Sequence, residues 1–144
     1  MPFIRAWIHF IWATKNREKI ISKELKSTLL DHITLNAKEK EIWIDTINCV
    51  SDHIHALVSL KADQSISKTV MLLKGESSYW INRNKLTKTK FEWQDEYIAV
   101  SVSESNADKV RRYIKNQEDH HSKKSFPEEY DDFMKKHQNY NYEI

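Results

Sequence analysis

The amino-acid sequence predicts an α+β protein with a ferredoxin-like, split βαβ fold: a four-stranded antiparallel sheet with helices on one face, plus a C-terminal helix. Segments whose apolar side chains alternate, as in strands, and segments with apolar residues at helical spacing follow one another in the order β-α-β-β-α-β-α. The 144 residues include one glycine and two prolines, and this scarcity favours long regular elements over loops. The sequence has no internal repeat, linker or low-complexity tract, so we expect one domain over residues 1–144.

The strands are predicted from alternating apolar side chains and from branched and aromatic residues. They cover residues 3–14, 41–50, 53–60 and 97–102. The second and third strands are expected to form an antiparallel hairpin through a tight turn at Ser51-Asp52. The first strand is expected to lie centrally, with an apolar face made of Ile4, Ala6, Ile8, Phe10 and Trp12 and a mixed face that includes His9. His9 can approach a site on that face, although such a position favours a structural histidine.

The helices are predicted from apolar residues at a spacing of three to four and from their capping residues. They cover residues 23–40, 65–85 and 107 to about 121, with a short polar helix from Pro127 to Lys136. Ser22 and Asn106 precede the first and third helices as expected N-caps. Gly75 lies inside the second helix and weakens the prediction that this helix is continuous.

The sharpest local pattern is Asp52-His53-Ile54-His55. Side chains alternate along a strand, so His53 and His55 point to one face while Ile54 enters the core. Two imidazoles about 7 Å apart at the backbone can converge on one divalent metal, although a merely polar sheet face is the alternative. Such a metal needs a third ligand from elsewhere in the chain, and Asp52 can orient one of the imidazoles.

Tyr113 and Gln117 lie one helical turn apart, on the same face of the third predicted helix. Taken alone, such a pair is typical of packing and surface positions. A tyrosine phenol can, however, attack a phosphodiester and remain joined to the phosphate, which conserves the bond energy for rejoining. Its ordinary pKa of about 10 makes it a weak nucleophile at neutral pH, and a divalent metal that polarises the phosphate compensates for this. Two imidazoles and an amide oxygen suit manganese or magnesium, and the imidazoles also accept zinc, nickel or cobalt.

In these motifs the sequence resembles the single-tyrosine transposases with a His-hydrophobe-His (HUH) motif, found in insertion sequences of the 200/605 kind. The resemblance covers nearly the whole chain, and its motifs occur in register with the predicted elements. They are Trp12-Ala13-Thr14-Lys15-Asn16-Arg17, Asp52-His53-Ile54-His55-Ala56-Leu57-Val58, Ile66-Ser67-Lys68, Leu73-Lys74-Gly75 and Arg112-Tyr113-Ile114-Lys115-Asn116-Gln117. Many members have proline where this chain has Ser51, a difference that should alter only the turn.

The resemblance implies that Tyr113 is the catalytic residue and that His53, His55 and Gln117 bind a magnesium or manganese ion. It implies a DNA transposase that recognises imperfect single-stranded hairpins at the ends of a mobile element. Cleavage would leave a 5′-phosphotyrosine link and a free 3′-OH, without a nucleotide cofactor. It further implies an obligate homodimer, in which the tyrosine helix of one subunit completes the histidine site of the other.

The charge balance does not by itself indicate nucleic-acid binding, because 23 basic side chains face 21 acidic ones and the formal net charge is +2. Any DNA-binding surface therefore depends on local basic clusters. The candidates are Lys15, Arg17 and Lys19, then Arg83, Lys85, Lys88 and Lys90, and finally Arg112. Four tryptophans are candidates for base stacking, although most are expected in the core: Trp7, Trp43, Trp80 and Trp93. His120-His121, near Gln117, is either a solvated helix end, a DNA contact or an extra ligand.

Three other interpretations remain open at this point. A non-catalytic module of the RNA-recognition type has a similar fold, but it needs exposed aromatics on its central strands where this chain has His53 and His55. A domesticated regulator would bind hairpins without cutting them, and a replication initiator or relaxase is usually a longer chain.

The single cysteine, Cys49, fits a reducing compartment, and the sequence has no evident signal peptide and no stretch of about 20 apolar residues. We therefore expect a cytoplasmic protein without a membrane partner.

Overall fold

The computed structural model describes residues 2–117, 127–128, 131 and 135. Four strands form one antiparallel sheet in the order β2-β3-β1-β4. The strands are β1 (Ala6–Ala13), β2 (Trp43–Cys49), β3 (His53–Leu60) and β4 (Ile98–Val102). The α-helices are α1 (Lys23–Glu39), α2 (Ile66–Arg83) and α3 (Ala107–Lys115), with short 3-10 turns at Lys15–Arg17 and Glu104–Asn106. The predicted fold class is confirmed, and the two central strands are β3 and β1.

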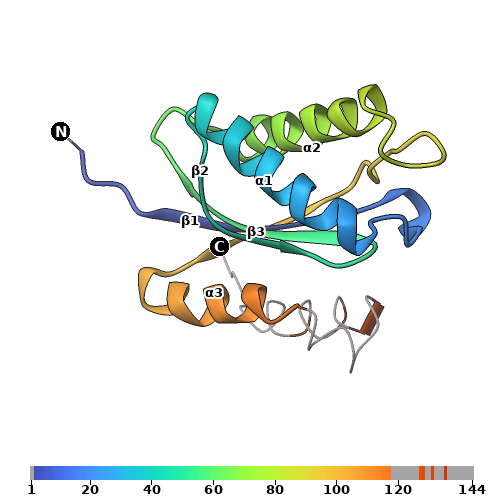
Figure 1. Ribbon diagram of the computed structural model, residues 1–144. Coiled ribbons are helices and arrows are strands. Elements are labelled where there is room, and N and C mark those ends of the chain that lie inside the picture. The colour runs from blue at the N-terminus through green and yellow to red at the C-terminus, as the bar shows by residue number, and fades with distance from the viewer. Residues whose placement is uncertain (1, 118–126, 129–130, 132–134, 136–144) are drawn as a thin grey trace.

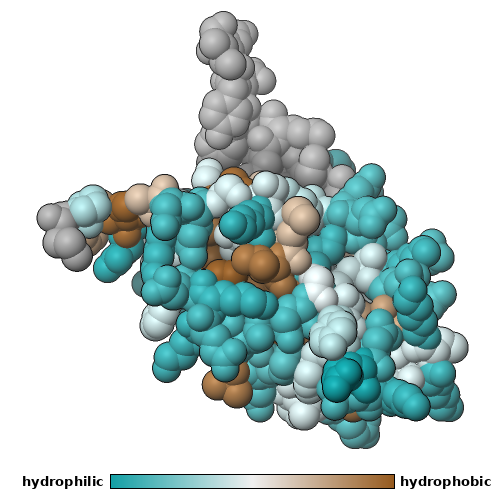
Figure 2. Space-filling model, turned by 90° about the horizontal axis from the view of Figure 1, so that it is seen from above, coloured by the Kyte–Doolittle hydropathy of each residue, from teal (hydrophilic) through white to brown (hydrophobic). Residues whose placement is uncertain are grey.

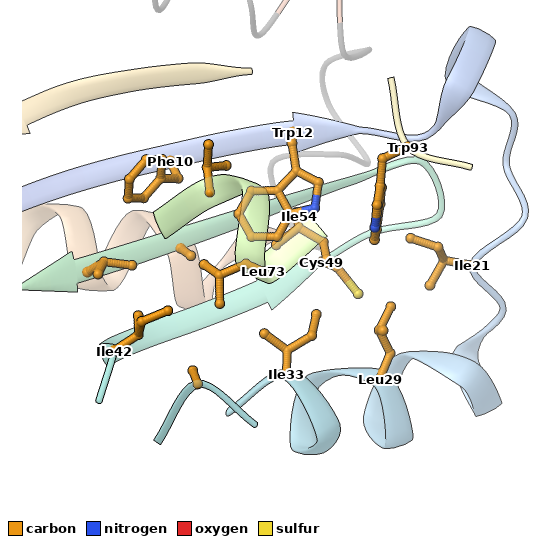
Figure 3. Close-up of a cluster of buried hydrophobic side chains, with 14 of the residues drawn as sticks. Phe10, Trp12, Ile21, Leu29, Ile33, Ile42, Cys49, Ile54, Leu73 and Trp93 are labelled. Atoms are coloured by element: carbon orange, nitrogen blue, oxygen red, sulfur yellow. The ribbon is translucent and has the colours of Figure 1, made fainter. Parts of the chain in front are cut away.

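Helices α1 and α2 lie on one face of the sheet, and α3 lies on the opposite face (Figure 1). The main core fills the space between the sheet and the α1–α2 layer. As predicted, the alternate residues Ile8, Phe10 and Trp12 of β1 enter this core. Figure 3 shows Trp12 and Ile54 from the sheet close to Leu73 of α2. Leu29 and Ile33 point from α1 toward the same cluster.

Both covering helices are amphipathic. Their inward residues are buried at helical spacing, and on α1 these are Leu25, Leu29, Ile33 and Ala37. The outward surface of this layer is mainly hydrophilic with a small hydrophobic patch (Figure 2). Ser22 caps α1 by accepting a hydrogen bond from the Leu25 amide at 3.1 Å, which confirms the predicted cap.

The second predicted helix is confirmed, because α2 runs without interruption through Gly75, at which an added Cβ would meet nothing within 4 Å. Two details of α3 differ from the prediction. Asn106 makes no side-chain capping bond to α3, because Glu104–Asn106 already forms a 3-10 turn that leads directly into the helix. Helix α3 ends at Lys115 rather than near residue 121, since Asn116 leaves the helical conformation. Residues 118–121, and most of the helix expected after Pro127, lie outside the described residues.

The first strand is shorter than predicted, because residues 2–5 lack strand structure and β1 begins at Ala6. The other end of β1 pairs with a segment that follows α2 in the chain. Thr14 forms a β-bridge with Trp93, and the Gln94 amide donates to the Ala13 carbonyl at 2.8 Å. Phe91 and Trp93 of this segment are buried in the main core.

The hairpin between β2 and β3 is confirmed. The Val50 amide donates to the His53 carbonyl at 3.1 Å, which closes the turn at Ser51-Asp52. An irregularity between Ile44 and Thr46 inserts Asp45 as an extra residue into β2.

None of the helices within the described residues combines the length and the apolar character that crossing a bilayer requires.

Candidate active site

His53 and His55 stand on the sheet face that also carries α3. In the pairing of β1 with β3, Ala13 lies opposite His53 and Ile11 lies opposite His55. The alternate residues Ile54 and Ala56 belong to the main core on the other face, as the strand periodicity predicts. Both histidines are fully buried, and their ring centroids are 5.1 Å apart.

Each imidazole is held through its Nδ1 atom. Asp52 Oδ1 lies 2.8 Å from His53 Nδ1, and because a carboxylate accepts, the neutral form of the His53 ring carries its proton on Nδ1 and its lone pair on Nε2. His9 Nε2 lies 2.9 Å from His55 Nδ1, with the two ring centroids 5.1 Å apart. A neutral ring with its proton on Nδ1 presents the Nε2 lone pair to a metal, which is the usual arrangement of metal-binding histidines. His55 has this form when His9 Nε2 accepts from its Nδ1.

His9 is the site residue that sequence reasoning undervalued. Its place on the mixed face of the first strand favoured a structural role, whereas the structure joins it to His55 by a buried hydrogen bond. The relevant signal was present, since His9 alternates with apolar residues on a strand that was predicted to lie centrally. The partner, 46 positions away, is set by the register of β1 against β3.

Helix α3 packs on the same sheet face through a second apolar cluster. Trp7, Leu57, Ala107 and Ile114 are its buried members, with Val102, Val110 and Tyr113 packed against them. Arg111 adds a two-pronged ion pair with Asp45, with Nε–Oδ1 at 2.6 Å and Nη2–Oδ2 at 3.2 Å. Its guanidinium also lies over the Trp7 ring, 5.3 Å from the centroid.

This packing brings Tyr113 to the histidines. Its half-buried ring lies edge-on to His55 and to His9, with centroid separations of 5.6 and 6.2 Å. Gln117 follows one turn later and is fully buried, and its Nε2 donates to the Tyr113 carbonyl at 3.3 Å. That bond assigns the nitrogen of the amide and leaves Oε1 able to act as a ligand.

The atoms present fit a divalent metal. Four buried side-chain atoms make no hydrogen bond within the described part of the chain: Trp12 Nε1 in the main core, and His53 Nε2, His55 Nε2 and Gln117 Oε1 on the α3 face. No three His, Cys, Asp or Glu side chains among the described residues form a group able to hold a metal. A metal here would therefore depend on the amide oxygen of Gln117 as its third protein ligand.

The resemblance implies a site shared between two subunits, with the tyrosine helix of one beside the histidines of the other. The structure contains one chain, and it places Tyr113 against His55 of that same chain. Within this chain, His53 contacts His55, His55 contacts Tyr113, and Tyr113 contacts Gln117. The arrangement shared between subunits stays a prediction. His120-His121, the other possible contributor, lies outside the described residues.

The predicted DNA-binding side chains are all exposed, and two of the three groups lie together. Lys15 and Lys90, from loops 75 positions apart, both contact Glu92, at 3.1 and 3.8 Å. Hydrogen bonding to Lys15 is the main reason that the pKa of Glu92 lies below its usual value. Figure 1 shows both loops at the end of the sheet where β1 leads into the Lys15–Arg17 turn, whereas Arg112 is on α3.

The four tryptophans that the sequence suggests for base stacking differ in how far they are buried. Trp7 and Trp93 are buried, and Trp80 is half-buried and stacks on His32 at 4.0 Å between centroids. Trp43, on the edge strand β2, is 59% exposed and is the only one of the four with an open ring. The expectation that most of them pack inside the protein is confirmed.

Comparisons with known proteins agree with the geometry. The sequence model of the family described as "Transposase IS200 like" matches residues 3–117. The chain is 29% identical to the ISDra2 transposase TnpA of Deinococcus radiodurans over 117 residues, which cover 77% of this chain and 83% of that protein. It is 26% identical to the transposase for insertion sequence element IS200 of Salmonella typhimurium over 115 residues, 76% of this chain and 74% of that one.

Two solved structures share the fold. One is a crystal structure at 1.90 Å described as that of a transposase from Deinococcus radiodurans, with a TM-score of 0.65 and 24% identity over 81% of this chain and 95% of that chain. The other is a REP-associated tyrosine transposase bound to a REP hairpin, with a TM-score of 0.65 and 14% identity over 84% of this chain and 71% of that chain. The family match spans β1 to Gln117 and includes His53, His55, Tyr113 and Gln117, so the chain belongs to the IS200-like transposase family and is a transposase of mobile DNA elements.

Proposed function

We propose that this transposase cleaves and rejoins single-stranded DNA at hairpin-bearing element ends through a covalent 5′-phosphotyrosine link to Tyr113. The observation that carries the proposal is the position of the Tyr113 ring, 5.6 Å from the ring of His55 and on the same sheet face as His53. A half-buried tyrosine beside two buried, oriented imidazoles is an arrangement suited to phosphoryl transfer.

In the cleavage step, the Tyr113 phenol oxygen forms a bond to the phosphorus of the scissile phosphodiester while the bond from phosphorus to the 3′ oxygen breaks. The phenol proton passes through water to that leaving oxygen, which becomes a 3′-OH. In the rejoining step, a 3′-OH of the exchanged strand attacks the phosphotyrosine, and the phenol is restored. No bond energy is lost between the two steps, so no nucleotide cofactor is needed.

His53, His55 and Gln117 would hold the metal through two imidazole nitrogens and one amide oxygen. When bound, a divalent ion such as Mg²⁺ or Mn²⁺ supplies positive charge that polarises the scissile phosphate. Asp52 and His9 each hold one imidazole by its Nδ1 atom, at 2.8 and 2.9 Å. Preset rings lower the entropic cost of binding the ion.

The DNA substrate is proposed from the charge distribution and from a relative. The exposed basic loops at Lys15–Arg17 and Arg83–Lys90 lie at one end of the sheet and can contact phosphates on either side of a hairpin foot. A REP-associated tyrosine transposase of the same fold has been solved bound to a REP hairpin. We further propose that the chain works as a homodimer and that its subunits can exchange their tyrosine helices.

The test uses labelled single-stranded DNA from the ends of the element that encodes the protein, with and without manganese. Covalent adducts are resolved on a denaturing gel for the native protein, Tyr113→Phe, His53→Ala and Tyr79→Phe. Tyr79 is the matched control, because it is an exposed tyrosine on α2, on the opposite side of the sheet.

We expect a manganese-dependent adduct with the native protein and Tyr79→Phe, and none with the two site variants. Tight binding of the hairpin by the native protein without any adduct would refute the cleavage mechanism. The chain would then be a hairpin-binding regulator derived from a transposase.

A further inference from the structure

We propose that Asn48 is a positioning residue for the tyrosine: its side-chain amide fixes the last turn of α3 on the sheet, and thereby the position of Tyr113 beside His55. This inference rests on the proposed function of Tyr113 as the nucleophile. Asn48 belongs to β2 and is not among the metal ligands or the DNA-binding side chains proposed above.

The contacts of Asn48 link the sheet to the helix end. Its Nδ2 donates to the carbonyl oxygens of Ile114 at 2.9 Å and Lys115 at 3.2 Å. Its Oδ1 accepts from the amide of Cys49 at 2.9 Å. The carboxamide is therefore held at both ends, so it cannot rotate away without losing hydrogen bonds on both sides.

The position of Asn48 in the sheet makes this contact relevant to the site. Asn48 lies directly opposite His55 in the pairing of β2 with β3. Its two acceptors belong to the final residues of α3, immediately after Tyr113 and just before Gln117. One side chain thus ties the segment that carries the nucleophile to the strand position next to a histidine of the site.

Helix α3 requires such directional hydrogen bonds, because apolar packing alone does not fix its rotation about its own axis. The contacts of Trp7, Leu57 and Ile114 are non-directional and tolerate small shifts. A rotation equivalent to one residue turns an α-helix by about 100°, which would carry Tyr113 off the histidine side. Hydrogen bonds from the sheet to the carbonyls of the last helical turn, whose i+4 donors lie beyond the end of the helix, restrict both rotation and sliding.

The Arg111–Asp45 pair does not replace this function. It joins the middle of α3 to β2 by a flexible side chain, and Arg111 also contacts Asp108 within the helix. A helix held only there can still pivot at its C-terminal end. Among the described residues, the hydrogen bonds of Asn48 are the side-chain contacts between sheet and helix that lie nearest to the end of α3 at which Tyr113 and Gln117 lie.

The test compares Asn48→Asp with Asn82→Asp in the full chain. Asn48→Asp keeps the acceptor for the Cys49 amide but replaces the donor with a carboxylate facing two carbonyl oxygens. Asn82 has the same chemistry elsewhere: its Nδ2 donates to the Phe91 carbonyl at 2.9 Å and its Oδ1 accepts from the Phe91 amide at 2.7 Å. Asn48→Ser, which is too short to reach the helix and adds no charge, is the second variant if the aspartate variant does not fold.

Three quantities are measured for each protein: hydrogen-exchange protection of residues 107–117, the single-turnover rate of adduct formation, and the Kd for the hairpin. For Asn48→Asp or Asn48→Ser we expect lost protection in α3 with unchanged protection in α1 and α2. We expect adduct formation to slow by about 10- to 100-fold, as a misplacement of about 1 Å can cause, with an unchanged hairpin Kd. Asn82→Asp should leave both α3 protection and the rate as in the native protein.

The proposal is overturned if the Asn48 variants retain native α3 protection and rate, or if Asn82→Asp lowers them equally. The exchange measurement also separates this proposal from the proposed function. If the native protein never forms an adduct, the nucleophile assignment fails, and α3 protection alone then decides whether Asn48 holds the helix.

Discussion

The tautomers of two histidines set the chemistry available at this site. Asp52 can only accept from His53 Nδ1, so the lone pair of the neutral form of this ring is on Nε2. His55 presents its Nε2 as a ligand in the same way when His9 Nε2 accepts from His55 Nδ1. The two supporting residues, Asp52 and His9, differ in how far they lie from their histidine along the chain. Asp52 is adjacent to His53 in the chain, whereas His9 comes from the neighbouring strand β1.

At the residue scale, His9→Phe is predicted to weaken manganese binding. Phenylalanine fills the space of the ring but has no nitrogen to hold His55 Nδ1, and the loss of such a supporting contact typically costs about 10- to 100-fold in metal affinity. Calorimetric titration with Mn²⁺ measures this directly, without DNA. The matched control is His32→Phe, because His32 bonds to Glu76 and stacks on Trp80 in the α1–α2 layer. Equal affinities of His9→Phe and the native protein would show that His9 does not orient His55.

At the element scale, α3 is held by charge as well as by apolar contact. Burial disfavours the charged form of Asp45, but hydrogen bonds from Arg111 and Thr46 outweigh this effect, and the pKa of Asp45 lies below its usual value. The same pair raises the pKa of Arg111 above its usual value, mainly through the hydrogen bond to Asp45. Asp45 occupies the irregular position of β2, where an extra residue lies beside the paired ladder.

This pair should make the stability of the protein depend on acid pH. A carboxyl group with a lowered pKa in the folded state contributes its full stability above its unfolded pKa, about 3.9, and loses it as the pH falls through the folded value. We expect the double-mutant cycle of Asp45→Asn and Arg111→Gln to give a coupling of about 1 kcal/mol at pH 7. Urea unfolding should show this coupling decreasing towards zero as the pH falls below about 4. A coupling that does not change with pH would contradict the ionic character of the contact.

At the scale of the whole molecule, folding joins basic loops that are distant in the sequence. The loop after β1 and the loop after α2 meet at Glu92, which contacts both Lys15 and Lys90. The combined surface lies at the end of the sheet where Ala13 pairs with His53. Phosphates bound there would lie on the path to the proposed site.

We predict that replacing Lys15, Arg17 and Lys19 together by glutamine weakens hairpin binding and flattens its salt dependence. The slope of log Kd against log salt concentration should fall by up to about 2 for three lost single-strand phosphate contacts. Fluorescence anisotropy from low to moderate salt measures both effects. Three exposed lysines elsewhere, Lys38, Lys61 and Lys68, provide a charge-matched control. If the control triple changes the slope as much, net charge rather than this surface determines binding.

The sequence alone determined what depends on local backbone geometry. Alternation on a strand placed His53 and His55 on one face and Ile54 in the core, and helical spacing identified the buried faces of α1 and α2. The same rules placed Tyr113 and Gln117 one turn apart. Local rules were less accurate at element ends, where Asn106 does not cap α3 and β1 begins at Ala6, because competing turns and strand partners determine those ends.

The tertiary structure alone decided which side chains of distant elements come into contact. Whether His9 reaches His55, whether Asn48 reaches the end of α3 and whether Arg111 reaches Asp45 depend on strand register and on the angle at which a helix packs. Neither is encoded in the few residues around any one of these positions. Register and packing angle follow from the fit of many apolar side chains across the whole sheet, so these contacts between distant residues appear only when the chain is folded.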